Sequence, residues 1–430
     1  MSARRRILIA GGGAAGISAA LAAAETGAEV TLVEMDGGLG GDLFSGMPLL
    51  GAFTAKGMQI SHGILDELLD SCRKIHPAGV IGPVCDYRTV VGLCLDPEVL
   101  RLAVCRLIGE HHVKLLLNTM IIGAEVRQGV LESVRVRSKN GGSILPLDSA
   151  VDATGGGYLA AMCGCNVFFG GEDKTFQPAS LVFRMCGVDY GKLLRHIRNH
   201  PEDVLLCENS ALPADRGEAA ELLERQGMPY AAFAAESSLL APAMKSGRLH
   251  PCTAAFITPT APERGEVCLN VTRAAGVDCS DDAAVSGVLP ALAEQVIRTA
   301  EFFQQGMPGF ADASVSHVFH KCGVRESGRI EGEAVLKQDD VISAAVFPDA
   351  VAQGCHHVDI HGSGTAQIRI PVRDGLAYDI PRGALCPKGL KNVFAAGRCI
   401  SSDRGANGSA RVMGTCISTG QAAAKLAAEI

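Results

Sequence analysis

The sequence contains no tryptophan and few aromatic residues of any kind. Its 430 residues include 14 Phe and 5 Tyr, against 51 Gly. Glycine lets the backbone approach a ligand closely, whereas aromatic side chains provide the platforms on which sugars stack. The composition therefore favours nucleotide chemistry over carbohydrate binding.

The chain also lacks an excess of positive charge. It has 39 Lys and Arg against 46 Asp and Glu, a net charge of -7 and no long basic block. A protein that binds the phosphate backbone normally carries a basic patch, so we expect no nucleic-acid partner. Hydrophobic residues make up 47% of the chain, which is enough for sizeable cores in two or three domain-sized units.

Metal-binding and disulfide motifs are missing, although 16 Cys and 12 His are present. No C-x-x-C or H-E-x-x-H occurs, and the nearest cysteines, Cys163 and Cys165, are separated by one residue. We therefore expect no zinc site, no cysteine-ligated cluster and no other metal. We interpret the cysteines as buried thiols of a cytoplasmic protein in a reducing compartment, with no membrane association.

The N-terminus allows two interpretations. Three arginines at 4–6 precede eighteen uncharged residues, 7–24, as in a secretory or twin-arginine signal. The alternative is a nucleotide-binding unit: a strand at 7–10, the G-x-G-x-x-G turn 11–16, a helix at 17–25 and a strand at 29–33 that ends at Glu34. We favour this unit, because it requires an acidic residue near Glu34 and a signal peptide does not.

Each part of the motif has a physical role in binding a dinucleotide. Gly11 permits the tight turn, Gly13 lets the backbone reach a pyrophosphate, and Gly16 lets helix and strand pack closely. The helix that starts at Ala14 and Ala15 presents its N-terminus to the negative charge. The Glu34 carboxylate would meet a ribose hydroxyl. A second glycine-rich turn, 36–42, contains Gly41 and can lie against a phosphate or ribose without side-chain clashes.

The rest of the chain alternates between helical and strand patterns. We expect helices at 59–76, 97–112 and 281–305, a β meander over 114–152 with a turn at 140–142, and a strand at 180–185. Residues 188–248 are charged and mostly helical, as in an inserted region that covers a site. The glycines at 155–157 fit a second fingerprint, but no β-α-β unit with a distal acid follows, so we expect one dinucleotide site.

Several motifs taken together are similar to a known family. They are N-V-T-R at 270–273, G-V-R-E-S-G-R-I-E-G at 323–332, Y-D-I-P at 378–381, N-V-F-A-A-G-R-C-I-S at 392–401, R-V-M-G-T-C at 411–416 and G-Q-A-A at 420–423. With the N-terminal fingerprint they resemble the FAD-dependent oxidoreductases related to the glutathione-reductase-type flavoproteins. One departure is Gly328, where the family usually has a second arginine.

The resemblance implies an α/β fold with a Rossmann-type FAD-binding domain and an inserted α+β domain. The FAD domain would comprise residues 1–157 and 389–430, and the substrate or cap domain residues 158–388. The residues implied to bind FAD, beyond those of the N-terminal unit, are Thr154, Gly155, Gly397, Arg398, Ser409, Arg411, Val412 and Met413. Residues 409–413 would open a final helix whose N-terminus faces the pyrimidine edge of the flavin, where negative charge develops on reduction.

The flavin would carry the hydride chemistry, and the protein would orient a substrate and manage one proton. His320 is the first acid/base candidate, because imidazole titrates near neutral pH; it also fits a packed turn equally well. Arg325 would either clamp a carboxylate or pair with an acid such as Glu326. His361 and Tyr378 are weaker candidates.

The expected function is hydride transfer between FAD and a small organic substrate, by a dehydrogenase or reductase, with an external electron acceptor or donor. Two alternatives remain open. One is an FAD-binding electron-transfer subunit that passes electrons to a protein partner. The other is a cofactor-bearing module with no turnover of its own. The sequence makes no prediction of oligomeric state.

Overall fold

A computed structural model describes residues 4–171, 174–362 and 365–430. Its central element is a five-stranded sheet in the order β22-β10-β1-β2-β6, in which all neighbours are parallel. Its strands are β1 (Arg6–Ala10), β2 (Glu29–Val33), β6 (Lys114–Leu116), β10 (Ser149–Asp152) and β22 (Val393–Ala395). The predicted strands at 7–10 and 29–33 are confirmed. The signal-peptide interpretation of residues 7–24 is wrong, because they form the central strand and the helix packed on it.

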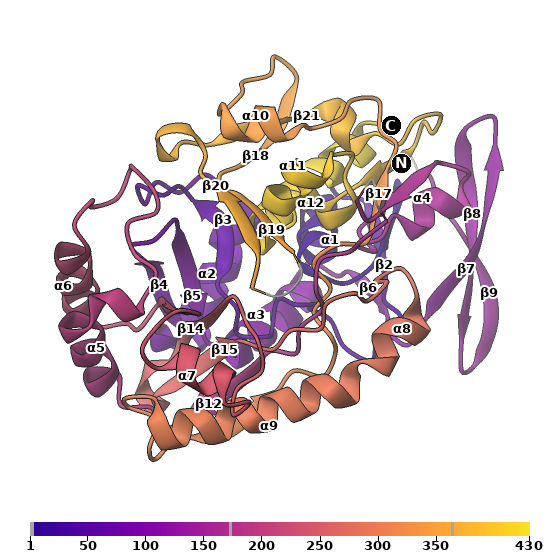
Figure 1. The fold of residues 1–430 in the computed structure, drawn as a ribbon. Coiled ribbons are helices and arrows are strands. Elements are labelled where there is room, and N and C mark those ends of the chain that lie inside the picture. Colours follow the sequence, from indigo (N-terminus) through magenta and orange to yellow (C-terminus); the bar gives the residue numbers. More distant parts are fainter. Residues whose placement is uncertain (1–3, 172–173, 363–364) are drawn as a thin grey trace.

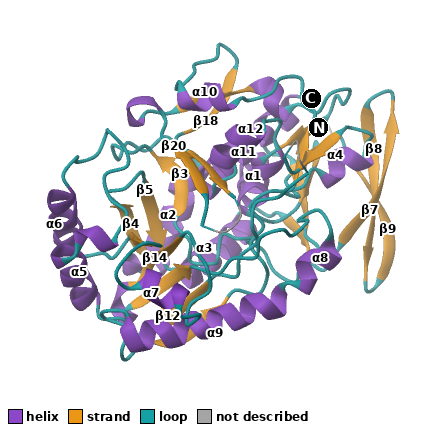
Figure 2. Cartoon of the chain, viewed as in Figure 1, coloured by secondary structure: helices purple, strands orange, loops and turns teal. Residues whose placement is uncertain are grey.

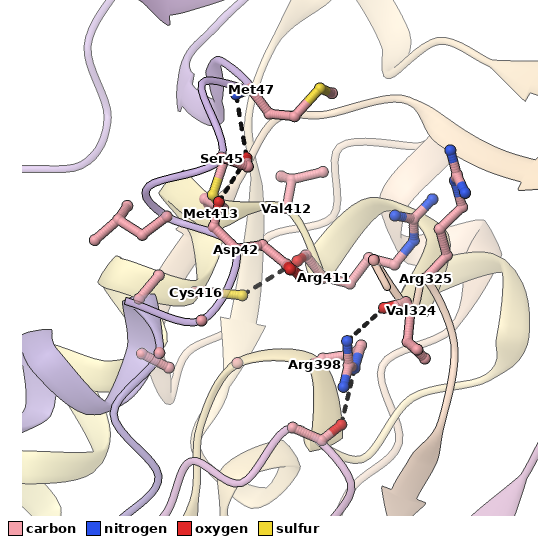
Figure 3. A pocket seen from close by; sticks show the side chains of 18 of the residues that line it. Asp42, Ser45, Met47, Val324, Arg325, Arg398, Arg411, Val412, Met413 and Cys416 are labelled. Atoms are coloured by element: carbon pink, nitrogen blue, oxygen red, sulfur yellow. Dashed lines mark hydrogen bonds between the residues drawn. The ribbon is translucent and has the colours of Figure 1, made fainter. Parts of the chain in front are cut away.

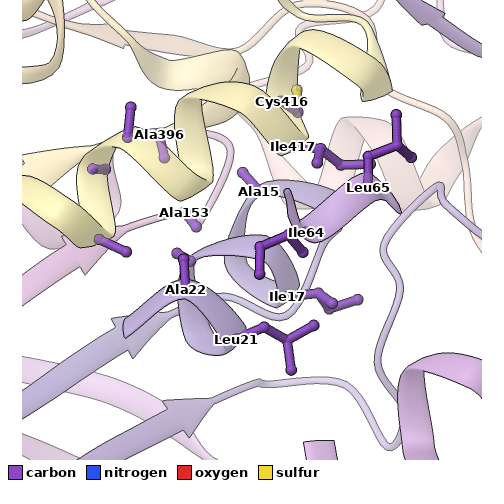
Figure 4. Packing of buried hydrophobic residues seen from close by; sticks show 14 of the residues in the cluster. Ala15, Ile17, Leu21, Ala22, Ile64, Leu65, Ala153, Ala396, Cys416 and Ile417 are labelled. Atoms are coloured by element: carbon purple, nitrogen blue, oxygen red, sulfur yellow. The ribbon is translucent and has the colours of Figure 1, made fainter. Parts of the chain in front are cut away.

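Two helices from opposite ends of the chain pack together against this sheet (Figure 4). They are α1 (Ala14–Glu25) and α12 (Met413–Glu429). Their contact is close because the facing residues are small: a Cβ on Gly420 would lie 2.2 Å from the Ala15 carbonyl oxygen. Ile17 and Leu21 of α1 are fully buried there. This alanine-rich pair forms the centre of the largest hydrophobic core.

A second unit is built around an antiparallel sheet in the order β13-β14-β15-β12-β16. Its strands are β12 (Phe183–Cys186), β13 (Ala231–Ala234), β14 (Ala254–Ala261), β15 (Glu266–Asn270) and β16 (Ser314–Val318). The associated helices are α5 (Tyr190–Asn199), α6 (Arg216–Gln226), α7 (Leu240–Lys245), α8 (Asp282–Gly287) and α9 (Leu289–Gly306). Figure 2 shows these helices on the outside of the unit, and a separate core fills its interior. Together the two units give an α/β fold with a Rossmann-type parallel sheet and an inserted domain.

Smaller elements join and flank the two units (Figure 1). A three-stranded sheet is formed by β3 (Leu49–Phe53), β4 (Val80–Cys85) and β5 (Val91–Leu95), and the meander by β7 (Met120–Arg127), β8 (Val130–Ser138) and β9 (Gly141–Pro146). The helices are α2 (Ile64–Ile75), α3 (Pro97–Glu110), α4 (Tyr158–Met162), α10 (Gln338–Ile342) and α11 (Arg404–Ala410). The remaining strands are β11 (Val167–Phe169), β17 (Gly328–Ile330), β18 (Ala350–Gly354), β19 (Val358–His361), β20 (Gln367–Ile370) and β21 (Tyr378–Pro381). The helices near 59–76 and 97–112 are confirmed. The meander predicted over 114–152 is confirmed for residues 120–146, whereas residues 114–116 and 149–152 form β6 and β10 of the parallel sheet.

Two predicted helices are each divided in the structure. The helix expected at 281–305 breaks at Val288, between α8 and α9. The break precedes Pro290, which has no N–H to continue a helix but is well placed in the first turn of a new one. The helix expected to open at 409–413 is α12, which starts at Met413, and residues 404–410 form the separate helix α11.

The glycines at 155–157 do not open a second nucleotide-binding unit. They lead into α4, which has five residues, and the next strand, β11, pairs antiparallel with β17. Gly328 lies in β17, where a Cβ would be 2.2 Å from the Gly156 carbonyl oxygen. This contact explains why glycine replaces the arginine expected there. Among the described helices, none combines the length and apolar character needed to cross a bilayer.

Candidate functional site

A cavity of about 640 Å³ lies between the parallel sheet and the antiparallel sheet. The residues that follow the carboxyl ends of β1, β2 and β10 line it on one side, and residues of β14 and the end of β15 line it on the other. In open parallel sheets, ligands bind in the crevice outside the carboxyl ends of the strands. We call the part lined by Gly11, Gly13 and Glu34 the glycine end, and the part lined by Arg325, His357 and Asp359 the arginine end.

At the glycine end, two of the three fingerprint glycines occupy positions that leave no room for side chains. Gly11 has φ +96°, and a Cβ on Gly16 would be 1.8 Å from the Gly11 carbonyl oxygen. Gly13 differs, because the nearest atom to its Cβ position is the Cα of Gly41 at 4.0 Å. Gly11 and Gly16 therefore permit the tight packing of turn, helix and sheet, while Gly13 faces the cavity along with Ala14 and Ala15.

Glu34 connects the end of β2 to the glycine turn. Its carboxylate accepts hydrogen bonds from the backbone N–H of Gly12 (2.6 Å) and of Asp36 (2.9 Å). The second glycine-rich turn lies directly beside the first, since the Gly40 N–H donates to the Gly12 carbonyl (2.8 Å). Gly41 also lines the cavity, and Lys321 adds a positive charge nearby, 3.9 Å from the Asp36 carboxylate.

Residues that follow the late strand β22 complete this wall (Figure 3). Gly397 has φ +76°, and its N–H donates to the Thr419 hydroxyl (3.0 Å). The Arg398 guanidinium donates from Nε to the Gly155 carbonyl (2.9 Å) and from Nη1 to the Val324 carbonyl. Thr154, Gly155 and Arg398 all line the cavity, so segments about 240 residues apart in the chain meet here.

The N-terminus of α12 also faces the cavity. Val412 and Met413 are lining residues, and no side chain caps the first turn of the helix. The free N–H groups of such a turn favour a negatively charged ligand. Ser409, expected at the start of this helix, instead lies inside α11 and outside the lining. It is fully buried, with its hydroxyl bonded to Tyr378 (2.7 Å) and to the His356 carbonyl (2.5 Å).

At the arginine end, Arg325 is held by neutral groups. Its Nη1 donates to the Pro178 carbonyl (2.7 Å) and the Ser180 hydroxyl (2.6 Å), and Nη2 donates to Asn270 Oδ1 (3.3 Å). The alternative that Arg325 pairs with Glu326 is wrong, because Glu326 accepts from Arg329 and Arg404 instead. Burial, together with the charge of Arg411, lowers the pKa of Arg325 to about 10.

A histidine cluster on and before β19 faces the same end. His361 lies 3.1 Å from the Asp359 carboxylate, and Arg411 lies 3.5 Å from it. His356 and His357 are 2% and 6% exposed, and neither ring has a hydrogen-bond partner in the described chain. Burial lowers the pKa of His357 to about 4 and that of His356 well below its usual value. Both imidazoles are therefore neutral at pH 7.

Ligand atoms of His356, His357 and Asp359 lie within 4.8 Å of one another, a spacing at which a metal ion can bind. No sequence motif pointed to this group. The histidine pair was visible in the sequence, and His361 was a weak candidate there, but only the fold brings β19 beside Arg325 and Arg411. Asn270, the last residue of β15, and Arg273, which follows it, also line the cavity without having been predicted to do so individually.

His320 does not reach the cavity. Its side chain is exposed and packs against the ring of Phe319, with 4.6 Å between centroids, whereas its neighbours Phe319 and Lys321 are lining residues. The cysteines are free thiols, and most of them are buried as expected, although Cys105 is exposed. Cys416 lies in the first turn of α12 and lines the cavity, and burial raises its pKa to about 12, so it is a neutral thiol and a poor nucleophile at pH 7.

Comparison with known proteins identifies one family. The family model described as FAD dependent oxidoreductase matches residues 6–429. No curated protein matches the chain. Solved structures with a similar chain path include a geranylgeranyl bacteriochlorophyll reductase-like protein from Thermoplasma acidophilum, with 12% identity, a TM-score of 0.47, and coverage of 99% of this chain and 79% of that chain. L-proline dehydrogenase from P. horikoshii has 11% identity, a TM-score of 0.42, and coverage of 97% and 92%.

Proposed function

Because the chain belongs to the family of FAD dependent oxidoreductases, we propose that it transfers a hydride between FAD and a small organic substrate, as a dehydrogenase or reductase. The protein is an FAD-dependent oxidoreductase. Beyond membership of this family, we propose the type of reaction, the residues that bind the cofactor and substrate, and the division of the chain into two domains. It keeps the resemblance to glutathione-reductase-type flavoproteins as its model for how the chain holds FAD.

In this proposal the glycine end holds the nucleotide part of FAD. The first turn of α1, with Ala14 and Ala15, would meet the pyrophosphate, because no side chain caps it and Gly13 leaves the approach open. Glu34 would bind the adenosine ribose. The other residues proposed to contact the cofactor are Gly11, Gly41, Thr154, Gly155, Gly397, Arg398, Val412, Met413 and the backbone of Arg411, while Gly16 keeps the turn closed.

We propose that residues 1–157 and 389–430 form the FAD domain and residues 158–388 the substrate domain. In support, the strands of the parallel sheet come from the first two segments, and those of the antiparallel sheet come from the third. The polar arginine end is lined by both sets of residues. A substrate there would meet the cofactor at the boundary between the two domains.

The observation that carries this proposal is the continuity of the cavity. One space runs from the glycine turns, past the uncapped N-terminus of α12, to the arginine end. When bound, the flavin of FAD supplies the group that accepts or donates the hydride. Arg325 would orient the substrate, since it lines the cavity and is held in place by three neutral acceptors. The proposal gives His320 no role, because its side chain lies outside the lining.

The test is the absorption spectrum of the purified protein, before and after denaturation, followed by anaerobic reduction. NADH, NADPH and a panel of alcohols and acids would be added to the holoprotein one at a time. We expect one of these small molecules to bleach the flavin band, or a reduced holoprotein to be reoxidised by one. A flavin that exchanges electrons only with a protein partner, or with nothing, would overturn the hydride-transfer proposal and favour an electron-transfer subunit or an inactive module.

A further inference from the structure

The arginine end of the cavity contains more guanidinium groups than carboxylates. Arg273, Arg325 and Arg411 lie around Asp359, which is shared with His361, and the charge of Asp42 also acts on Arg325. Arg325 bonds only to neutral acceptors, and Arg273 bonds to His361 Nδ1 (3.4 Å) and to backbone carbonyls. A buried charge is costly unless an opposite charge or a full set of hydrogen bonds compensates it. Three cations and two carboxylates, one of which is shared with His361, therefore leave positive charge that a ligand can neutralise.

Arg411 is poorly satisfied by the protein itself. Its Nη2 reaches the Asp359 carbonyl at 3.3 Å and the carboxylate at 3.5 Å, and its Nε is buried with no partner. In Figure 3 the side chains of Arg411 and Arg325 extend to the same side of the pocket. Planar guanidinium groups bind carboxylates through paired N–H donors. These two residues are thus suited to one carboxylate held between them.

Other charges at this end already have partners. Arg88 donates to the Glu208 carboxylate at 2.9 Å, and Arg369 pairs with the same carboxylate. The Asp86 carboxylate accepts the backbone N–H groups of residues 88–90. Asp42 also lines the cavity, and its charge acts on Arg325, although no ion pair joins it to a described residue. The uncompensated charge is therefore concentrated at Arg273, Arg325 and Arg411.

A metal ion is the competing occupant of this region. His356, His357 and Asp359 have a suitable spacing, but the Asp359 oxygens already accept from Gln367 (2.6 Å) and His361 (3.1 Å). A cation here would also lie beside the Arg411 guanidinium, with like-charge repulsion in a buried site. An anion gains from the same surroundings, and the two neutral imidazoles remain free to share a proton with it.

We infer that the substrate is a small organic anion whose carboxylate binds between Arg325 and Arg411, with Arg273 and the His356–His357 pair beside it. The identification of this ligand as the substrate rests on the proposed function. The binding site itself rests on the geometry of the arginine end alone. Neutral analogues, such as the amide of the same acid, would lose the ionic part of the interaction and bind weakly.

The test uses the FAD-loaded protein and needs no turnover. Acetate, oxalate, lactate, succinate and benzoate would each be titrated against the oxidised holoprotein, with the flavin absorption spectrum and isothermal titration calorimetry as readouts. We expect at least one carboxylate to give a saturable spectral shift and its amide to give none. Arg325→Gln and Arg411→Gln should each lower the affinity for that carboxylate at least tenfold. Arg325→Lys, which keeps the charge, should lose less affinity.

Arg298→Gln on the surface of α9 is the matched control and should bind the carboxylate as the unchanged protein does, since its side chain is 51% exposed and pairs with Glu294. FAD content and melting temperature show whether each variant is folded. The inference is overturned if no carboxylate binds, if the amide binds equally well, or if a folded Arg411→Gln variant keeps full affinity. A stoichiometric metal found by elemental analysis at His356 and His357 would also overturn it. If a carboxylate binds to the protein but no small molecule reduces its flavin, the proposed function is wrong and the carboxylate site stands.

Discussion

Two glycines of the same turn have different roles, Gly16 in packing and Gly13 in the approach of the cofactor. A Cβ on Gly16 would overlap the Gly11 carbonyl oxygen at 1.8 Å, whereas a Cβ on Gly13 would enter the open cavity. We predict that Gly16→Ala lowers the free energy of unfolding by about 3 kcal/mol, because α1 must move away from β1. Gly13→Ala should change the free energy of unfolding little and instead lower the affinity for FAD at least tenfold. Urea unfolding of the apoprotein and FAD titration measure the two effects separately, and equal effects of both substitutions would contradict the assignment.

Glu34 is the charged residue that ties the glycine turn to β2. We predict that Glu34→Gln raises the dissociation constant of FAD about tenfold, or about 1.4 kcal/mol, because the amide loses the charge-assisted bonds to the Gly12 N–H and to the ribose. Fluorescence of FAD titrated with apoprotein provides the measurement. Glu29→Gln is the control, since Glu29 is exposed on the same strand. A similar loss in both variants would show that general electrostatics, not this contact, matters.

The sequence predicts the position of these residues because they act locally. Gly11, Gly13, Gly16 and Glu34 fall within one strand-helix-strand unit, whose hydrogen bonds join residues close in the chain. The arginine end is different. Arg325 and Arg411 were candidates, but Arg273 and the histidine pair come close to them only through the packing of β15 and β19. No spacing in the sequence records that proximity.

At the scale of elements, patterns predicted the existence of helices better than their ends. The interruption between α11 and α12 is set by tertiary packing: a Cβ on Gly408 in α11 would lie 2.7 Å from the Asp359 carbonyl of β19, while Gly420 packs α12 against α1. Val412 is extended at the junction, with ψ 151°. A helical sequence pattern does not record which strand or helix each part of the segment will contact. It therefore gives no sign of the junction between α11 and α12.

Where a side chain caps the start of a helix, its effect on stability can be predicted more closely. Asp96 caps α3 by accepting the Glu98 N–H (2.9 Å), and it also pairs with Arg264 (3.0 Å). We predict that Asp96→Ala lowers the free energy of unfolding by about 1–2 kcal/mol, because the first turn of α3 loses its acceptor. Asp96→Asn keeps the cap and should lose only the part due to the ion pair. Urea denaturation of both variants provides the comparison, and an equal loss in Asn and Ala would assign the effect to the ion pair.

For the whole molecule, the sequence predicts the two units but not the way they enclose a cavity. The parallel sheet needs β22, which lies more than 200 residues beyond β10 in the chain, and the cavity needs both sheets. These long-range pairings place His356 and His357 in an interior without partners for their rings. Burial of neutral imidazoles then links the stability of the whole fold to pH.

The sign of this linkage follows from the direction of the shifts. Burial lowers the pKa of His357 to about 4 and that of His356 well below its usual value of 6.5, so the unfolded chain binds protons that the folded chain does not. Above pH 6.5 these histidines are neutral in both the folded and the unfolded state, so they do not change the free energy of unfolding. As the pH falls from 6.5 towards 4, protonation of the unfolded state lowers the free energy of unfolding, by up to about 1.4 kcal/mol per pH unit for each histidine.

We predict that the holoprotein loses several kcal/mol of unfolding free energy between pH 7 and pH 5, of which each histidine contributes about 2 kcal/mol. Urea unfolding at constant ionic strength and excess FAD measures this loss. In His357→Gln the share of His357 disappears, so the pH dependence becomes shallower even if the variant is less stable at pH 7. A His357→Gln slope equal to that of the unchanged protein would mean that His357 is protonated in the folded state, as an imidazole paired with a bound anion would be.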